Sequence, residues 1–447
     1  MGLSMPATLP SLPAHLLLLF LLQVGLLLAT ATLMGRLAAR FGMPAVAGEL
    51  LTGVLLGPSL LGYLAPGFWG WLFPSRPEQA FMLDAVAQVG VLLLVGVTGM
   101  HLDRTVLRQR GLTAATVSVG GLLVPLVLGV GAGFLLPETF RGEQADRTVL
   151  ALFIGVALAV SAIPVIAKTL SDMGLLHRNI GQLIVTAAVV DDTAAWFLLS
   201  LVSALATTGL TLGAAGLSVA SILAFVAVAL TVGRPLVQFL MQLAARSTVP
   251  GTSAATAVVI ILLAAAGSHA LHLEPVFGAF IAGILIGTAE QQARETLPAP
   301  AEGYRSPLAP LRTTVLSVFA PIFLATAGLR VDLSALAQPA VLLAGIGVLV
   351  VAIAGKFTGA YLGARLGRLG HWEAVALGAG LNARGVVEII VASIGLRVGI
   401  LSAAAYTIVV LVAVATSIMA PPILRYAVAH LESTPEELRR LQALGQR

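Results

Sequence analysis

The stretch IGQLIVTAAVVDDTAAWFLLSLV (residues 180–202) contains only two charged residues, the adjacent Asp191 and Asp192 near its middle. A run of about 20 mainly apolar residues is long enough to cross the hydrocarbon core of a bilayer as a helix. An aspartate at the centre of such a helix costs roughly 2.5–3.5 kcal/mol on insertion scales, and acids kept there bind ions, carry protons or pair with buried cations. The stretch therefore predicts a functional site inside a membrane helix.

The composition of the whole chain supports this interpretation. The chain is 58% hydrophobic and 10% charged, with a mean hydropathy of +1.00, whereas soluble domains have roughly 25% charged residues. It has 0 cysteines, which excludes a disulfide framework and a thiolate metal site. A formal charge of +5 in such a chain indicates basic loops on one side of a membrane rather than a nucleic-acid partner. We therefore expect an all-α integral membrane protein whose main partner is the lipid bilayer.

Similar apolar runs recur along the chain and predict about 13 transmembrane helices. Loops of one parity, together with the C-terminal tail, hold seventeen arginines, and loops of the other parity hold five. Because arginine and lysine concentrate in cytoplasmic loops, we expect a multi-pass cell (plasma) membrane protein with its N-terminus outside and its C-terminus in the cytoplasm. The expected spans are residues 14–36, 43–64, 80–100, 111–136, 148–171, 179–206, 211–237, 251–271, 275–289, 308–329, 338–364, 371–396 and 401–427.

The chain also resembles itself at a nearly constant offset. GELLTGVLLG (48–57) resembles GAFIAGILIG (278–287), GMHLD (99–103) resembles GLRVD (328–332), and PVIAKTLSDMGLL (164–176) aligns with GVVEIIVASIGLR (385–397). These matches pair spans one to six with spans eight to thirteen, and the odd number of crossings between them turns the second half upside down. The pattern predicts the two inverted six-helix repeats of secondary transporters. We expect a first repeat at 1–206, a connector at 207–250, an inverted second repeat at 251–430 and a short cytoplasmic tail at 431–447.

Helix-breaking residues occupy corresponding spans of the two halves. Pro164 lies in the fifth span, where it lacks an amide hydrogen and its ring clashes with the preceding turn. The twelfth span contains GLNARGVVEII, with Asn382 and Gly385 close together. Such matched interruptions are the best sequence pointer to a midplane site made by crossed, broken helices. Crossed helix ends bring partial charges together, so we expect Asn382, Arg384 and Glu388 to stabilise the crossing rather than to touch substrate.

A titratable cation lies within the eleventh expected span. The chain has twenty-three arginines and two lysines, yet it places Lys356 well inside an apolar run. A buried lysine can lose its proton near neutral pH, whereas arginine stays charged. We therefore expect Asp192 to bind either a monovalent cation or protons, and Asp191 to pair with Lys356 when the cation is absent. Two protons would then exchange for one cation, and transport would be electrogenic.

Four motifs together carry a resemblance to a known family: VVDDTAAW (189–196), SAIP (161–164), AGKFTGAYLG (354–363) and GLNARGVVEIIVASIG (380–395). Over nearly the whole chain, the sequence resembles the second cation:proton antiporter family, including bacterial sodium/proton antiporters and plant cation/proton exchangers. The resemblance implies a homodimer with a mobile core domain, an elevator-like movement, and exchange of Na+ or K+ for H+ without a cofactor.

The resemblance also implies roles for individual residues. Asp192 matches the ion-binding carboxylate of the family, and Ser161 matches a hydroxyl near the break that helps to bind the cation. Asp191 and Lys356 match the pair that accompanies electrogenic exchange. Plant exchangers often have Asn in place of the first acid, so the chain departs from them here. The sequence shows no nucleotide-binding domain after the last expected span, which argues against the glutathione-gated potassium efflux type.

Other classes of function remain open at this stage. A sodium-coupled symporter of small organic anions, of the bile-acid type, would share the crossed-helix architecture, although polar ligands rather than an acid pair with a lysine would be expected. An ion channel or sensor is a second alternative, although no filter-like motif or voltage helix is visible. We do not expect an enzyme, because the histidines show no metal spacing. Three further acids, Glu49, Asp84 and Glu274, receive no role from the sequence, which also leaves Na+ and K+ undistinguished.

Overall fold

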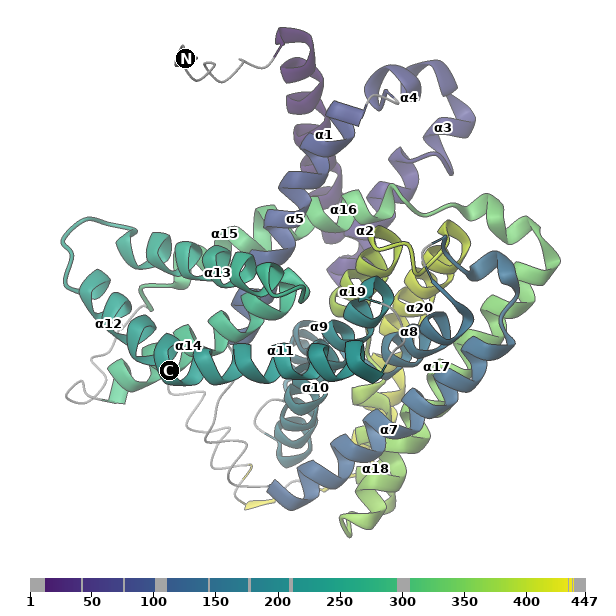
Figure 1. Ribbon diagram of the computed structural model, residues 1–447. Helices are drawn as coiled ribbons and strands as arrows, with labels where there is room; N and C mark the ends of the chain where they lie inside the picture. The colour runs from purple at the N-terminus through teal and green to yellow at the C-terminus, as the bar shows by residue number, and fades with distance from the viewer. Residues whose placement is uncertain are drawn as a thin grey trace.

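The computed structural model describes residues 13–41, 43–74, 77–100, 111–143, 145–175, 178–208, 212–295 and 306–432, together with residues 434, 435 and 437 (Figure 1). These parts of the chain are almost entirely helical, and they contain one isolated bridge, between Arg141 and Leu401. The all-α class predicted from the sequence is therefore confirmed. The longer helices are α1 (Ala14–Arg40), α2 (Ala45–Leu56), α5 (Pro77–Met100), α7 (Gly111–Leu135), α8 (Arg147–Ala159), α9 (Ile163–Asp172), α10 (Asn179–Thr208), α11 (Leu212–Val228), α12 (Arg234–Ala245), α13 (Thr252–Ala270), α14 (Pro275–Glu295), α16 (Ala320–Gly328), α17 (Pro339–Leu366), α18 (His371–Leu381), α19 (Val386–Arg397) and α20 (Ala403–Val428), and the shorter ones are α3 (Leu61–Leu64), α4 (Pro66–Leu72) and α15 (Ala309–Thr314).

Within the described residues, eleven helices are long and apolar enough to cross a membrane. The bent pair of α18 and α19, which meet at 44°, raises this number to twelve. The expected count of about 13 is not confirmed, because α8 is a shorter apolar helix of 13 residues that ends at a break before α9. An apolar run in the sequence does not distinguish a continuous span from one that is interrupted at its centre.

The helices group into two bundles. The core bundle contains α7, α8, α9, α10, α17, α18, α19 and α20, and the flanking bundle contains α1, α2, α5, α13, α14 and α16. In Figure 1, α13 and α14 lie on the opposite side of the molecule from α7 and α17. Small residues allow close helix packing in each bundle: a Cβ on Gly359 would lie 2.2 Å from the carbonyl oxygen of Gly120, and one on Gly328 would lie 2.2 Å from that of Leu50. Glycine is therefore required where α17 meets α7 and where α16 meets α2.

A C-terminal segment packs against the start of α10. The Glu437 side chain is buried, and its Oε1 accepts a hydrogen bond of 2.5 Å from the backbone amide of Asn179, the first residue of α10. Its Oε2 lies 3.2 Å from Nε of Arg178. A carboxylate at a helix N-terminus satisfies an unpaired amide and interacts favourably with the helix dipole. The segment thus caps the helix that carries Asp191 and Asp192.

Candidate ion-binding site

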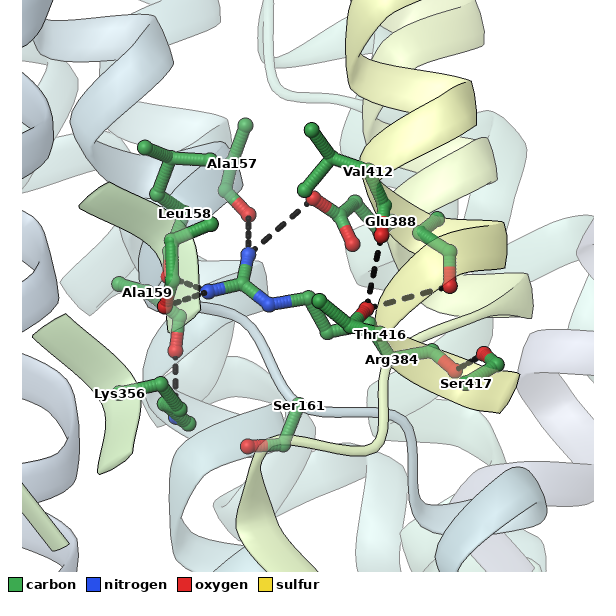
Figure 2. A network of polar contacts seen from close by, with 12 residues as sticks. Ala157, Leu158, Ala159, Ser161, Lys356, Arg384, Glu388, Val412, Thr416 and Ser417 are labelled. Atoms are coloured by element: carbon green, nitrogen blue, oxygen red, sulfur yellow. Dashed lines mark hydrogen bonds and ion pairs between the residues drawn. The ribbon is translucent and has the colours of Figure 1, made fainter. Parts of the chain in front are cut away.

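The candidate site lies where two interrupted helices cross. Residues 160–162 separate α8 from α9, and residues 382–385 separate α18 from α19. The two extended segments contact one another directly, because the amide of Ala162 donates to the carbonyl of Ala383 at 3.4 Å. The hydroxyl of Ser161 donates to the carbonyl of Leu381 at 3.2 Å. Figure 2 shows these segments passing each other beside Ser161.

The helix breakers lie at the start of the second half-helix in each pair. Pro164 is the second residue of α9, so the unwound residues precede it. We expected the break at the proline itself, but a proline in the first turn of a helix loses no intrahelical hydrogen bond and is tolerated there. Gly385 caps α19 with φ +155°, and a Cβ at this position would lie 2.7 Å from Cγ2 of Val165. Only glycine suits both the backbone and the available space.

Two cations satisfy the carbonyl groups left free where α8 stops. Arg384 donates to the carbonyls of Ala157 at 3.3 Å and Leu158 at 2.6 Å. Lys356 Nζ donates to the carbonyl of Ala159 at 2.7 Å (Figure 2). The last carbonyls of a helix lack intrahelical donors and carry partial negative charge. Arg384 and Lys356 therefore compensate the C-terminal end of the broken helix inside the protein.

Arg384 also connects three other elements of the core bundle. It donates to Glu388 at 3.1 Å, one turn into α19, and to the carbonyl of Ala352 on α17 at 3.1 Å. Its own carbonyl accepts a hydrogen bond from Ser417 on α20. The side chains of Arg384 and Glu388 are both fully buried. A buried ion pair needs such additional hydrogen bonds to offset its desolvation, so the geometry supports a structural role for Arg384 and Glu388.

Asp191 faces the lysine. Its Oδ2 accepts hydrogen bonds from Lys356 Nζ at 2.7 Å and from Ser161 Oγ at 3.1 Å. All three side chains are 0% exposed. Two of the predicted residues, Asp191 and Lys356, are 165 positions apart in the sequence and form one buried ion pair here.

Asp192 differs from its neighbour because no ion pair joins it to another described residue. It is 0% exposed, and within the described part of the chain neither carboxylate oxygen has a hydrogen-bond partner. The backbone amide of Ile163, the first residue of α9, directs partial positive charge towards this carboxylate. The side-chain oxygen of Asn382 is likewise buried with no hydrogen-bond partner in the described ranges. Unpaired oxygens at a crossing are ligands suited to a small monovalent cation or to protons.

The three acids to which the sequence assigned no role lie away from the crossing. Asp84 pairs with Arg330, and Glu274 pairs with Arg397 at 2.9 Å. Glu49 lies on α2 against Gly35 of α1. The described residues contain no group of three or more His, Cys, Asp or Glu side chains that could hold a metal ion. No sequence signal identified the partner of Glu274, because Arg397 is 123 residues further along the chain.

Comparison with known proteins identifies the family. The family profile described as "Sodium/hydrogen exchanger, transmembrane" matches residues 26–429, which is most of the chain. The chain belongs to the sodium/hydrogen exchanger family. Identification from the sequence as a monovalent cation:proton antiporter is thereby confirmed. The family consists of transporters rather than enzymes.

Several individual relatives support the family assignment. The chain is 31% identical to the Na(+)/H(+) antiporter NhaS4 of Synechocystis, over 91% of this chain and 96% of that protein. It is 26% identical to the Na(+)/H(+)-K(+) antiporter GerN of Bacillus cereus, over 91% of this chain and 96% of the relative. It is also 31% identical to the Cation/H(+) antiporter 15 of Arabidopsis thaliana, covering 90% of this chain and only 47% of the plant protein.

A solved structure shares the fold. The sodium/proton antiporter MjNhaP1 of Methanocaldococcus jannaschii superposes with a TM-score of 0.66 at 16% sequence identity, over 95% of this chain and 99% of that one. At this identity the likeness shows a shared fold.

Proposed function

We propose that this exchanger-family protein is an antiporter that exchanges Na+ or K+ for protons, with two protons moving against one cation. The observation that supports the proposal best is the contrast between two adjacent buried acids. Asp191 is neutralised by Lys356, whereas the two oxygens of Asp192 have no partner among the described residues. Asp192 binds the cation or a proton, and the two compete for the same carboxylate.

The second proton comes from the ion pair. A cation at Asp192 adds positive charge next to Lys356, and Asp191 turns from the lysine to the cation. Lys356 then loses its main counter-charge in a fully buried position, where the charged form of an amine is strongly disfavoured. It releases its proton, and exchange carries one net charge across the membrane. Ser161, which already touches Asp191, contributes a neutral oxygen to the cation.

The proposal includes the topology and assembly that the sequence suggests. The N-terminus is outside and the C-terminus in the cytoplasm of the plasma membrane. Two inverted repeats, 1–206 and 251–430, are joined by the connector at 207–250 and followed by the tail at 431–447. The protein is a homodimer, and its core bundle moves relative to the flanking bundle in an elevator-like step.

Flux measurements in proteoliposomes test the exchange. Wild-type protein moves protons when Na+ or K+ is added, with no organic substrate present, and Asp192→Asn abolishes this flux while the protein stays folded. Asp84→Asn is the matched control, since Asp84 is a membrane-region acid that pairs with Arg330 away from the crossing. Substantial cation-dependent proton flux in the Asp192→Asn variant contradicts the assignment.

The same preparation tests the stoichiometry. One net charge in the field is worth about 2.3 kcal/mol per 100 mV, so the cation gradient at which flux reverses shifts when the potential is clamped at a new value. A reversal point that ignores the potential shows that one carboxylate does all the coupling and that Lys356 is structural.

A further inference from the structure

A stripe of polar side chains runs along α10 away from the candidate site. Asp192, Trp196, Ser200 and Ser203 follow one another at helical spacing, so they lie on one face of α10. Trp196 Nε1 and Ser200 Oγ are buried, and neither has a hydrogen-bond partner among the residues that the structure describes. The ring of Trp196 lies 6.1 Å from that of Phe280 on α14. The stripe therefore runs along the seam between the core bundle and the flanking bundle.

The far end of this stripe meets a charged cluster. Ser203 faces the carboxylate of Glu274, which immediately precedes α14. Glu274 Oε2 lies 2.9 Å from Arg397 Nη2, and Arg397 Nη1 donates to Oε1 of Gln88 at 2.7 Å. The Glu274 side chain is 8% exposed and that of Arg397 is 34% exposed. The cluster thus has one side in water and one side against the buried stripe.

These contacts cross the boundary between the bundles. Arg397 ends α19 and Ser203 belongs to α10, both in the core bundle, whereas Glu274 and Gln88 belong to the flanking bundle. Movement of one bundle relative to the other therefore has to break the ion pair between Glu274 and Arg397. A partly desolvated Arg–carboxylate pair is stronger than a fully exposed one, and the exposed side of Arg397 allows water to replace the contact when it breaks.

We propose that Glu274 and Arg397 form the gate between the Asp192 site and the side of the membrane on which α14 begins. This inference rests on the proposed function, in whose topology that side is the outside. In the present conformation the pair and the Trp196–Phe280 contact close the seam. When the gate opens, the indole and hydroxyl groups of Trp196 and Ser200 provide hydrogen-bonding partners for a hydrated monovalent cation or proton on its way to Asp192.

The absence of cysteine from the chain makes a direct test possible. Ser200→Cys places a single thiol on the stripe, and its reaction with a membrane-impermeant methanethiosulfonate reagent reports access from each side of oriented vesicles. Glu274→Gln should speed labelling from the α14-start side about tenfold, which corresponds to about 1.4 kcal/mol. Arg397→Gln should give the same increase, and the double variant should add nothing further.

Glu290→Gln is the matched control. Glu290 lies towards the other end of α14 and pairs with Arg312 of α15 at 2.6 Å, without involving the core bundle. This variant should leave the labelling rate unchanged. The gate proposal is contradicted if the thiol is labelled at equal rates in the Glu274→Gln and Glu290→Gln backgrounds, or if labelling becomes faster only from the opposite side. Ser203→Cys, on the same face of α10, is a second reporter that must show the same pattern if Ser200→Cys fails to fold.

The test separates the gate from the proposed exchange. Labelling of Ser200→Cys does not require turnover, so the effect of Glu274→Gln must persist when Asp192→Asn is also present. If the protein with Asp192 intact shows the labelling effect but no cation–proton exchange, the gate is supported and the proposed function is contradicted. Normal exchange without any labelling effect supports the function and contradicts the gate.

Discussion

Replacing Arg384 by Gln tests whether the crossing is held together mainly by this side chain. Arg384 makes hydrogen bonds to the carbonyls of Ala157, Leu158 and Ala352 and pairs with Glu388. Leaving a buried polar group unpaired costs about 1–3 kcal/mol, and a glutamine can reach at most part of this set. Removing one partner of a buried ion pair typically costs about 3–5 kcal/mol. We expect Arg384→Gln to lower the free energy of unfolding by at least ~4 kcal/mol.

Glu388→Gln is the companion variant, and it should be milder. It removes the carboxylate charge, but Arg384 keeps its three carbonyl partners and the glutamine oxygen can still accept a hydrogen bond. We expect a loss of roughly 2 kcal/mol, below the usual cost of breaking a buried pair. Thermal unfolding in detergent, followed for both variants and wild type, gives the order of stability. If Arg384→Gln is as stable as wild type, or Glu388→Gln is the less stable variant, the capping of α8 is not what stabilises the crossing.

Three further outcomes follow from the same geometry. Gly385→Ala should destabilise the protein by several kcal/mol, because φ +155° and the 2.7 Å approach to Val165 both disfavour a Cβ; a normal unfolding temperature would refute this. Asp191→Asn should destabilise the protein at a pH where Lys356 stays charged, and the double variant Asp191→Asn/Lys356→Gln should regain stability, as measured by thermal unfolding at two pH values. A double variant that stays as unstable as the single one argues against a charge effect. Burial acts to raise the pKa of Glu437, but backbone amide donors and a nearby arginine outweigh this effect and hold the pKa below its ordinary 4.5. The carboxylate that caps α10 is therefore fully ionised above pH 4.5, and the cap is lost as the pH falls through the lowered pKa. Hydrogen exchange in the first turn of α10 should therefore rise at low pH, and at neutral pH in Glu437→Gln; equal protection in that variant and wild type would show that the cap contributes little.

Much of the fold could be predicted from the sequence because lipid imposes one strong rule. Backbone polar groups in hydrocarbon must be satisfied internally, so long apolar runs must be helices. The predicted spans 338–364 and 401–427 correspond closely to α17 and α20. The span predicted at 148–171 does not correspond to a single helix, because its centre is the break between α8 and α9. Pro164 predicts an interruption in this span, but the residues that unwind, 160–162, precede it, and their tertiary contact through Ala162 and Ala383 carries no sequence signal.

The site could be predicted in part for a similar reason. Charged residues in apolar runs stand out, so Asp191, Asp192 and Lys356 are visible in the sequence, and so is the expectation that Asp191 pairs with Lys356. The hydrogen bond from Lys356 to the carbonyl of Ala159 carries no such signal. The contacts of Arg384 with carbonyls of α8 were not predictable, since any backbone carbonyl can accept and none carries a sequence signal. Glu274 was visible as an acid near a membrane boundary, but its position at the seam depends on how α10, α14 and α19 pack.

The capping of α8 by Arg384 and Lys356 has a consequence for how the protein is made. Both side chains come from the part of the chain synthesised after α8, α9 and α10 have left the ribosome. Until Arg384 and Lys356 arrive, the carbonyls of Ala157, Leu158 and Ala159 have no donors from this crossing, and each unsatisfied group in hydrocarbon costs several kcal/mol. The early helices therefore cannot settle into their final arrangement alone. The membrane insertion machinery has to hold or hydrate an unfinished crossing until the last third of the chain completes it.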